Sequence, residues 1–181
     1  MSKKDRKIII ISGKQFSGKD TVANVLMKIF PDFKLAPLAD AIKIEFSQKK
    51  NITFNEVERN KPLYRVDLIE FSNKTRAKDQ DYWIKKVLSS EDNIIISDVR
   101  LQYEMKVFDK LDVTKIRVES DLDERNKRGN LVKEDDFTEI DLDNYKDWDY
   151  IIKNNSTVEL LEKKADEVGE KILRTLLAQK V

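Results

Sequence analysis

The chain has 181 residues, the size of one ordinary domain, and a formal net charge of +1 at pH 7. This near-balance of charge gives no electrostatic reason to expect a nucleic-acid or membrane partner. Histidine and cysteine are both absent, which excludes Ser-His and Cys-His nucleophiles, disulfides and His-ligated metal sites. Any chemistry must therefore use Lys, Arg, Asp, Glu, Ser, Thr or Tyr side chains.

Composition also indicates the class of protein and its compartment. Charged residues make up 38% of the chain and hydrophobic residues 40%, which predicts a compact fold with a heavily charged surface. The apolar run at 8–11 is too short for a signal peptide, and no stretch reaches the length of a membrane span. Together with the absence of cysteine, this leads us to expect a cytoplasmic protein.

The first half of the chain alternates strand and helix patterns. Residues 7–12 (KIIIIS) form a continuous β-branched run, typical of a strand buried on both faces of a parallel sheet. A helix is predicted over 20–30, a short strand over 33–36 and a second helix over 39–48. A capping-box pattern then opens a helical stretch over 53–88, which we expect in several pieces.

The second half begins with another strongly apolar strand. Residues 93–97 (NIIIS) are predicted to be a buried strand, followed by a helix over 102–110 and a strand over 115–119. Ser120 is predicted to cap a short helix that Gly129 ends.

The C-terminal part is less regular at its start. Residues 130–144 are polar and acidic and are predicted to form a mobile loop, before a last strand over 148–153. Ser156 and Glu159 have the spacing of a capping box, and apolar residues at helical spacing follow them. The chain is therefore expected to finish with an amphipathic helix.

Strands that alternate with helices imply a parallel sheet with right-handed crossovers and helices on both faces. We predict an α/β fold with a five-stranded parallel sheet, in a single domain over 1–181 with a helical insertion over 37–90. Ligands of such sheets bind beyond the carboxyl ends of the strands. That rule brings together the 13–21 loop, Asp98, Ser120 and Asn154.

The loop at 13–21 has the G-x-x-x-x-G-K pattern of a phosphate-binding loop between a strand and a helix. Gly13 and Gly18 let the backbone wrap phosphates closely, and Lys19 adds a charge for the β- and γ-phosphates. This pattern predicts a P-loop NTPase that binds ATP.

A carboxylate follows the loop lysine, where most P-loops carry the Ser or Thr that binds Mg²⁺. Asp20 is a candidate Mg²⁺ ligand because a carboxylate suits a hard cation, and the neighbouring Thr21 is the alternative. A simple first-turn helix charge is the other interpretation of Asp20. Asp98 follows an apolar strand, as the metal-organising carboxylate of P-loop kinases does, or else forms an ordinary Asx turn.

Arginines near these sites are candidates for phosphate recognition. Arg100 lies two residues after Asp98, where a transferred phosphate would arrive. Arg125 and Arg128 share one face of a short helix and are expected to act as a lid over a triphosphate, unless they are only a solvated face paired with Glu124. Four further cations in the helical insertion are candidates for binding a phosphate-bearing acceptor, against the simpler interpretation of surface charge: Lys43, Lys61, Arg65 and Arg76.

An acceptor that is itself a phosphate would explain the missing histidine. A phosphate oxygen is already ionised at neutral pH, so its attack needs no general base. Catalysis then consists of positioning and charge stabilisation.

Several segments together resemble the animal-type phosphomevalonate kinase family: SGKQFSGKD at 12–20, ISDVR at 96–100, RNKRG at 125–129 and DLDNYKDWDYIIKNN at 141–155. Further segments, at 42–54, 61–69 and 74–79, are similar to that family's acceptor-binding insertion. The resemblance implies a nucleoside-monophosphate-kinase-like fold, ATP with Mg²⁺, and a small phosphate monoester acceptor that becomes a diphosphate.

The resemblance also implies roles for individual residues. It assigns nucleotide binding to Lys14, Ser17, Gly18, Lys19 and Asp20, with Asn154 near the adenine, and the loop motif itself adds Gly13 and Thr21. It assigns the acceptor to Lys43, Lys61, Arg65, Arg76 and Arg100, and a lid over 120–144 to Arg125 and Arg128. From the motifs we assign transfer itself to Lys19, Arg100, Arg125 and Arg128, and the metal to Asp20 and Asp98.

Two alternatives stay open at the level of sequence. Leu101 stands where the family pattern has a second arginine, which removes a charge-assisted contact of about 1.5–3 kcal/mol. The loop and the SDVR strand also resemble phage-type deoxynucleoside monophosphate kinases, so a nucleotide acceptor is one alternative. A non-catalytic ATP-binding module is the other, and whether the protein is a monomer or a dimer is not determined.

Overall fold

The computed structural model describes residues 6–131 and 134–179. The chain divides into two compact units, one formed by Met1–Leu35 with Asp92–Val181 and the other by Ala36–Glu91. The second unit is a continuous segment inserted between two strands of the first. The expectation of a single domain over the whole chain stays a prediction.

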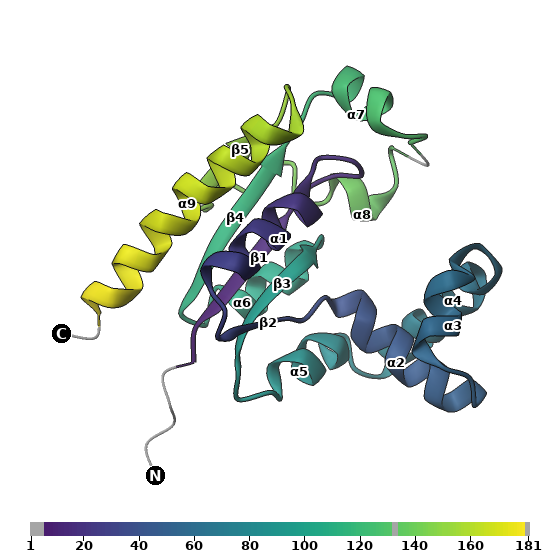
Figure 1. The fold of residues 1–181 in the computed structure, drawn as a ribbon. Coiled ribbons are helices and arrows are strands. Elements are labelled where there is room, and N and C mark those ends of the chain that lie inside the picture. Colours follow the sequence, from purple (N-terminus) through teal and green to yellow (C-terminus); the bar gives the residue numbers. More distant parts are fainter. Residues whose placement is uncertain (1–5, 132–133, 180–181) are drawn as a thin grey trace, which may run out of the picture. The chain divides into compact units, whose positions relative to one another are not determined.

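The first unit is built on a parallel sheet, which confirms the fold predicted from the sequence (Figure 1). Its five strands lie in the order β2-β3-β1-β4-β5. Their bounds are Ile8–Ser12 for β1, Phe33–Leu35 for β2, Asn93–Val99 for β3, Val113–Glu119 for β4 and Tyr150–Lys153 for β5. The central strand β1 is buried along its whole length, as its unbroken isoleucine run predicts.

Helices cover both faces of this sheet. Helix α1 (Lys19–Ile29) and helix α9 (Val158–Ala178) pack side by side on one face (Figure 1), where Gly169 lets α9 approach Leu26 and Ile29. Right-handed crossovers from β1 to β2 and from β3 to β4 run in opposite directions, so α6 (Gln102–Phe108) lies on the other face.

Most boundaries differ from expectation by one to three residues, and the larger differences have local causes. Strand β3 continues to Val99, because Val99 pairs with Ser12 after a register irregularity, so Asp98 lies inside the strand instead of after it. Strand β5 begins at Tyr150 because its pairing with β4 starts there.

Two predicted helix caps are wrong by one residue. Asp121, not Ser120, stands at the N-cap of α7 (Leu122–Arg128), while the Ser120 hydroxyl accepts a hydrogen bond from Arg128 at 2.9 Å. Thr157, not Ser156, caps α9 by accepting the Leu160 N–H. The end of α7 at Gly129 agrees with the sequence.

The acidic segment after α7 contains a helix that the sequence did not predict. Helix α8 (Phe137–Ile140) is a single turn, capped by the Asp136 carboxylate, which accepts the Thr138 N–H at 3.0 Å. Residues 132 and 133 of the expected lid lie outside the described residues.

The second unit is entirely helical in the structure. Its helices are α2 (Leu38–Lys50), α3 (Phe54–Arg59), α4 (Lys61–Lys78) and α5 (Tyr82–Leu88). Phe46, Val57 and Trp83 are buried at its centre, and Phe71 packs against the rings of Phe46 and Trp83. None of the helices in the described part of the chain is long and apolar enough to cross a membrane.

Candidate active site

The loop between β1 and α1 has the geometry of a phosphate cradle. Gly18 has φ +97, a left-handed conformation that favours glycine, and it stands directly before the first residue of α1. A Cβ at Gly18 would lie 2.6 Å from the side chains of Asn154 and Leu161, so the position has no room for a larger residue. The first helical hydrogen bond runs from Val22 N–H to Gly18 O, which leaves the amides of the preceding helical residues for an anion.

Groups from elsewhere in the first unit hold this loop in shape. The Asn154 side chain, buried at the end of β5, donates to Ser17 O at 2.8 Å. Arg128 donates to Phe16 O at 3.1 Å and to Asn154 O at 2.9 Å. Asn154 and Arg128 were expected at the adenine and over the triphosphate, and here both contact the backbone of the loop.

The Ser17 hydroxyl lies beside Gly13, where an added Cβ would be 2.4 Å from its oxygen. It is 1% exposed and has no hydrogen-bond partner among the described residues. A buried hydroxyl without a partner is costly, so it marks a position at which a ligand oxygen would be stabilised.

Lys19 is the cation at the centre of the site. Burial lowers its pKa, and the Arg100 guanidinium adds to the lowering, while the carboxylates of Asp20, Glu139 and Asp98 oppose it. Three carboxylates and a second cation therefore act on one half-buried ammonium group, so Lys19, Asp20, Asp98 and Arg100 share one electrostatic neighbourhood.

Arg100 is fixed through both its main chain and its side chain. Its N–H donates to the buried Glu104 carboxylate at 2.8 Å, and its guanidinium pairs with Glu139. Leu101, the departure from the family pattern, is 7% exposed, so its side chain faces the interior.

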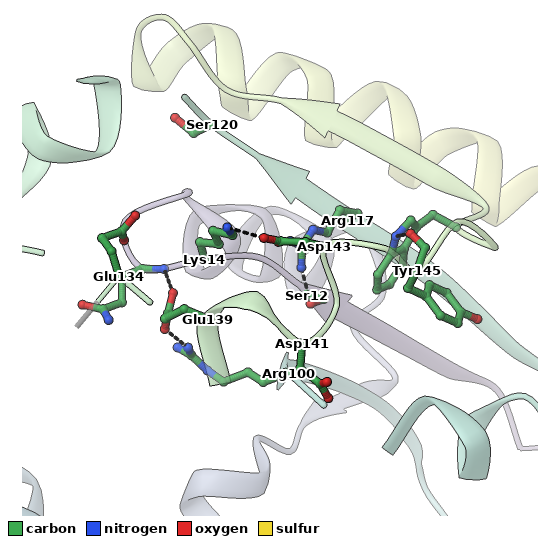
Figure 2. A network of polar contacts seen from close by, with 12 residues as sticks. Ser12, Lys14, Arg100, Arg117, Ser120, Glu134, Glu139, Asp141, Asp143 and Tyr145 are labelled. Carbon is green, nitrogen blue, oxygen red and sulfur yellow. Dashed lines mark hydrogen bonds and ion pairs between the residues drawn. The ribbon is translucent and has the colours of Figure 1, made fainter. Parts of the chain in front are cut away.

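A network of polar contacts that sequence reasoning missed lies beside the loop (Figure 2). Lys14 pairs with Asp143 at 2.7 Å, and Asp143 also accepts from Arg117 at 3.3 Å. Arg117 is buried in β4 and donates to Ser12 at 2.9 Å. The sequence did offer a signal for this network, namely an arginine inside the strand pattern KIRVE. A buried arginine needs carboxylate or hydroxyl partners, so Arg117 indicated that such groups lie near it.

The Arg125 guanidinium is held by groups of the protein itself. It is buried and makes a two-pronged pair with Glu134, at 2.6 and 2.7 Å. It also donates to Ser120 O at 3.2 Å and Gln15 O at 3.4 Å. Its partner is therefore Glu134, and not the Glu124 considered from the sequence, which pairs with Lys127.

The four acceptor candidates lie in the helical second unit. Lys43 is largely buried and pairs with Asp40 at 2.6 Å and with Glu58, and Lys61 pairs with the other oxygen of Glu58 at 2.8 Å. Arg65 is exposed on α4. Arg76 donates to Asn73 at 3.4 Å, and its Nε is buried without a partner among the described residues.

The residues present fit a nucleotide with a divalent cation. The glycine cradle, the Ser17 hydroxyl, which has no partner among the described residues, and the half-buried Lys19 suit phosphate oxygens. Asp20 and Asp98 are two carboxylates near Lys19, and Mg²⁺ typically takes one or two carboxylates together with substrate phosphates. No group of three or more acidic side chains able to hold a metal by itself occurs in residues 6–131 and 134–179.

Comparison with known proteins agrees with this geometry. The model of the family described as "Phosphomevalonate kinase" matches residues 11–115, more than half of the chain and including the whole phosphate loop and Arg100. The chain belongs to the phosphomevalonate kinase family. A phosphomevalonate kinase of Drosophila melanogaster is 27% identical over 171 residues, covering 84% of this chain and 90% of that protein.

Solved structures support the fold of this family member. TT1252 from Thermus thermophilus matches with a TM-score of 0.54 at 19% identity, over 98% of this chain and 100% of the other. Shikimate kinase from Acinetobacter baumannii, solved with shikimate, matches with a TM-score of 0.54 at 16% identity, over 97% and 96%. At such identities the likeness shows the fold alone. Membership of the family makes the chain a phosphotransferase that uses ATP.

Proposed function

We propose that this phosphomevalonate kinase family member transfers the γ-phosphate of ATP to phosphomevalonate, giving a diphosphate product and ADP. The observation that carries the proposal is that the phosphate loop, with Lys19 and Asp20, adjoins the end of β3, with Asp98 and Arg100, both within the segment that matches the family. Ser12 pairs with Val99, and Glu139 contacts both the Gln15 N–H and the Arg100 guanidinium. A donor cradle and a fixed arginine beside it suit transfer between two phosphates.

The chemistry needs little from the protein beyond placement and charge. An oxygen of the acceptor phosphate attacks the γ-phosphorus of ATP, the bond from that phosphorus to the β-phosphate oxygen breaks, and ADP leaves. The acceptor oxygen is already ionised, which is consistent with a chain that has no histidine. Lys19 and Arg100 would stabilise the negative charge on the transferred group and the acceptor.

We propose that Mg²⁺ accompanies ATP, with Asp20 and Asp98 holding it directly or through water and Thr21 as the neighbouring hydroxyl. The ion would supply charge neutralisation at the phosphates. Gly13, Lys14, Ser17 and Gly18 complete the nucleotide site.

We assign acceptor recognition to the cations of the second unit, namely Lys43, Lys61, Arg65 and Arg76, together with Arg100. For Lys43 and Lys61 the support is their proximity, because both pair with the Glu58 carboxylate and their ammonium groups therefore lie close together. Asp40 and Glu58 balance the two charges here, so an anionic acceptor would exchange with a carboxylate partner. Arg125, Arg128 and Asn154 are proposed to act on the nucleotide in a closed state, after exchanging their present partners. The protein is proposed to act in the cytoplasm on small molecules.

A coupled ADP-release assay tests the proposal. Mg-ATP is supplied with no acceptor, with phosphomevalonate, with ribo- and deoxynucleoside monophosphates, and with dephospho-CoA. We expect turnover with phosphomevalonate alone, and its loss when EDTA removes the metal. Faster turnover of a nucleoside monophosphate would show that the acceptor is a nucleotide and not phosphomevalonate. ATP binding with no turnover on any acceptor would contradict the kinase assignment.

A further inference from the structure

Glu139 is a buried carboxylate that contacts both the phosphate loop, proposed to bind the donor, and Arg100, proposed to bind the acceptor. Its side chain is 2% exposed. One of its oxygens accepts the Gln15 N–H of the phosphate loop at 2.8 Å, and the other pairs with the Arg100 guanidinium (Figure 2). A buried charge is stable only when it is paired and hydrogen-bonded. Glu139 therefore ties the donor loop to the arginine.

The turn that carries Glu139 is itself anchored. Asp136 caps it at the start. At its end, the Asp141 carboxylate accepts the Gln102 N–H at 2.6 Å, and Asp141 O accepts from the Gln102 side chain at 2.9 Å. Gln102 follows Arg100 by two residues, so Glu139 is held against the same segment that carries its arginine partner.

Arg100 is the only arginine at this turn, since Leu101 follows it. A guanidinium has five N–H donors in a rigid fork, and the pair with Glu139 uses one terminal nitrogen, Nη1. With the main chain held by Glu104 and Nη1 held by Glu139, the guanidinium is restrained at two points and its other donors are left for a phosphate.

We propose that Glu139 is a positioning residue for the transfer: it fixes the Arg100 guanidinium relative to the phosphate loop, so that the acceptor phosphate meets the γ-phosphate in the correct orientation. The inference rests on the proposed function, because it assigns Arg100 to the acceptor phosphate. It adds a residue that acts through Arg100 and does not itself contact the reacting atoms.

A kinetic double-mutant cycle tests the proposal on the acceptor that the wild type uses. Glu139→Gln keeps an oxygen for the Gln15 N–H but removes the charge that orients Arg100. We expect kcat/KM for the acceptor to fall about ten- to a hundredfold, with KM for ATP changed less than about threefold. In an Arg100→Ala background the same change should cost less than about twofold. An equal loss in both backgrounds, or no loss in either, would overturn the proposal.

A second variant protects the test against a folding defect in the first. Arg100→Lys leaves Glu139 a cationic partner but removes the planar fork, and it should reproduce the loss that is specific to the acceptor. Wild-type acceptor kinetics in Arg100→Lys would contradict the positioning role. Glu162→Gln, on the exposed side of α9, is the matched control and should leave all constants unchanged.

A crystal structure of Glu139→Gln needs no acceptor. The Glu139 carboxylate joins Arg100 to the phosphate loop, so in the variant we expect the Arg100 guanidinium to leave its wild-type position while the main chain of the loop keeps its own. An Arg100 guanidinium unchanged relative to Gln15 would overturn the inference. This outcome does not depend on whether the wild type turns over phosphomevalonate, which is the result that tests the proposed function.

Discussion

Burial disfavours the charged form of Lys19 and lowers its pKa, while three nearby carboxylates favour the charged form. Lys19→Ala removes the donor aimed at the β- and γ-phosphates and also relieves that burial. We therefore expect kcat to fall at least about a hundredfold, with the melting temperature unchanged or raised. Lys28→Ala, on the exposed side of the same helix, is the control. Wild-type turnover in Lys19→Ala would refute the assignment of the loop.

The lowered pKa of Lys19 also predicts the pH dependence of activity. The free enzyme should lose the ammonium charge below pH 10.5, the ordinary lysine value. The kcat/KM for ATP should accordingly decline on the alkaline side before an exposed lysine would titrate.

The titration of Lys19 should change stability in the direction opposite to activity, so its contribution to the free energy of unfolding should rise with pH. Because the folded-state pKa lies below the unfolded one, the unfolded chain binds more protons in that window. The contribution of Lys19 to the free energy of unfolding thus grows as pH rises through it. The test measures kcat/KM for ATP and the free energy of unfolding as a function of pH, in the wild type and in Lys19→Ala. If the Lys19 contributions to activity and to stability both declined as the pH rose, this account would be contradicted.

The cap of α9 illustrates how far an element boundary can be predicted. Thr157 accepts the Leu160 N–H in the structure, although Ser156 offered an equally good pattern. Thr157→Ala should lower the free energy of unfolding by about 1 kcal/mol, whereas Ser156→Ala should change it by less than about 0.5 kcal/mol. Urea denaturation of the two variants distinguishes them, and the reverse order would restore the cap expected from the sequence.

The start of α1 depends on a glycine in the left-handed region. Gly18→Ala should destabilise the protein by about 1–2 kcal/mol from backbone conformation alone, and more from the contacts of its Cβ with Asn154 and Leu161. ATP binding should be lost together with stability, since the cradle and the helix start are one structure. Asn24→Ala, on the exposed side of α1, provides a control for helix substitutions. A fully stable Gly18→Ala that binds ATP would contradict the cradle geometry.

Elements with a strong local pattern were predicted from the sequence, and those held by distant partners were not. The strands β1 and β3 were recognisable as isoleucine runs and α9 as a regular apolar stripe. Helix α8 is one turn long, and its tertiary anchors lie at Gln15, Arg100 and Gln102, well before it in sequence. Only the Asp136-x-x-Glu139 spacing, similar to a capping pattern, marked it.

At the scale of the whole molecule the same division applies to the site. The phosphate loop is contiguous, so its residues could be listed from the motif. The pairs of Lys14 with Asp143 and of Arg117 with Ser12 join residues 129 and 105 positions apart. Such pairs depend on the order of strands in the sheet, and the sequence predicted the class of sheet without that order.

Each of the two units carries one of the chain's two tryptophans. Trp83 is buried in the second unit beside Phe71 and Tyr82, and Trp148 of the first unit lies under the Arg117 guanidinium. The variants Trp148→Phe and Trp83→Phe therefore give each unit its own fluorescence reporter. A single cooperative domain predicts coincident urea transitions for the two variants. Separate midpoints would show that the helical segment between β2 and β3 unfolds independently of the first unit. Tryptophan fluorescence would then report the unfolding of each unit separately.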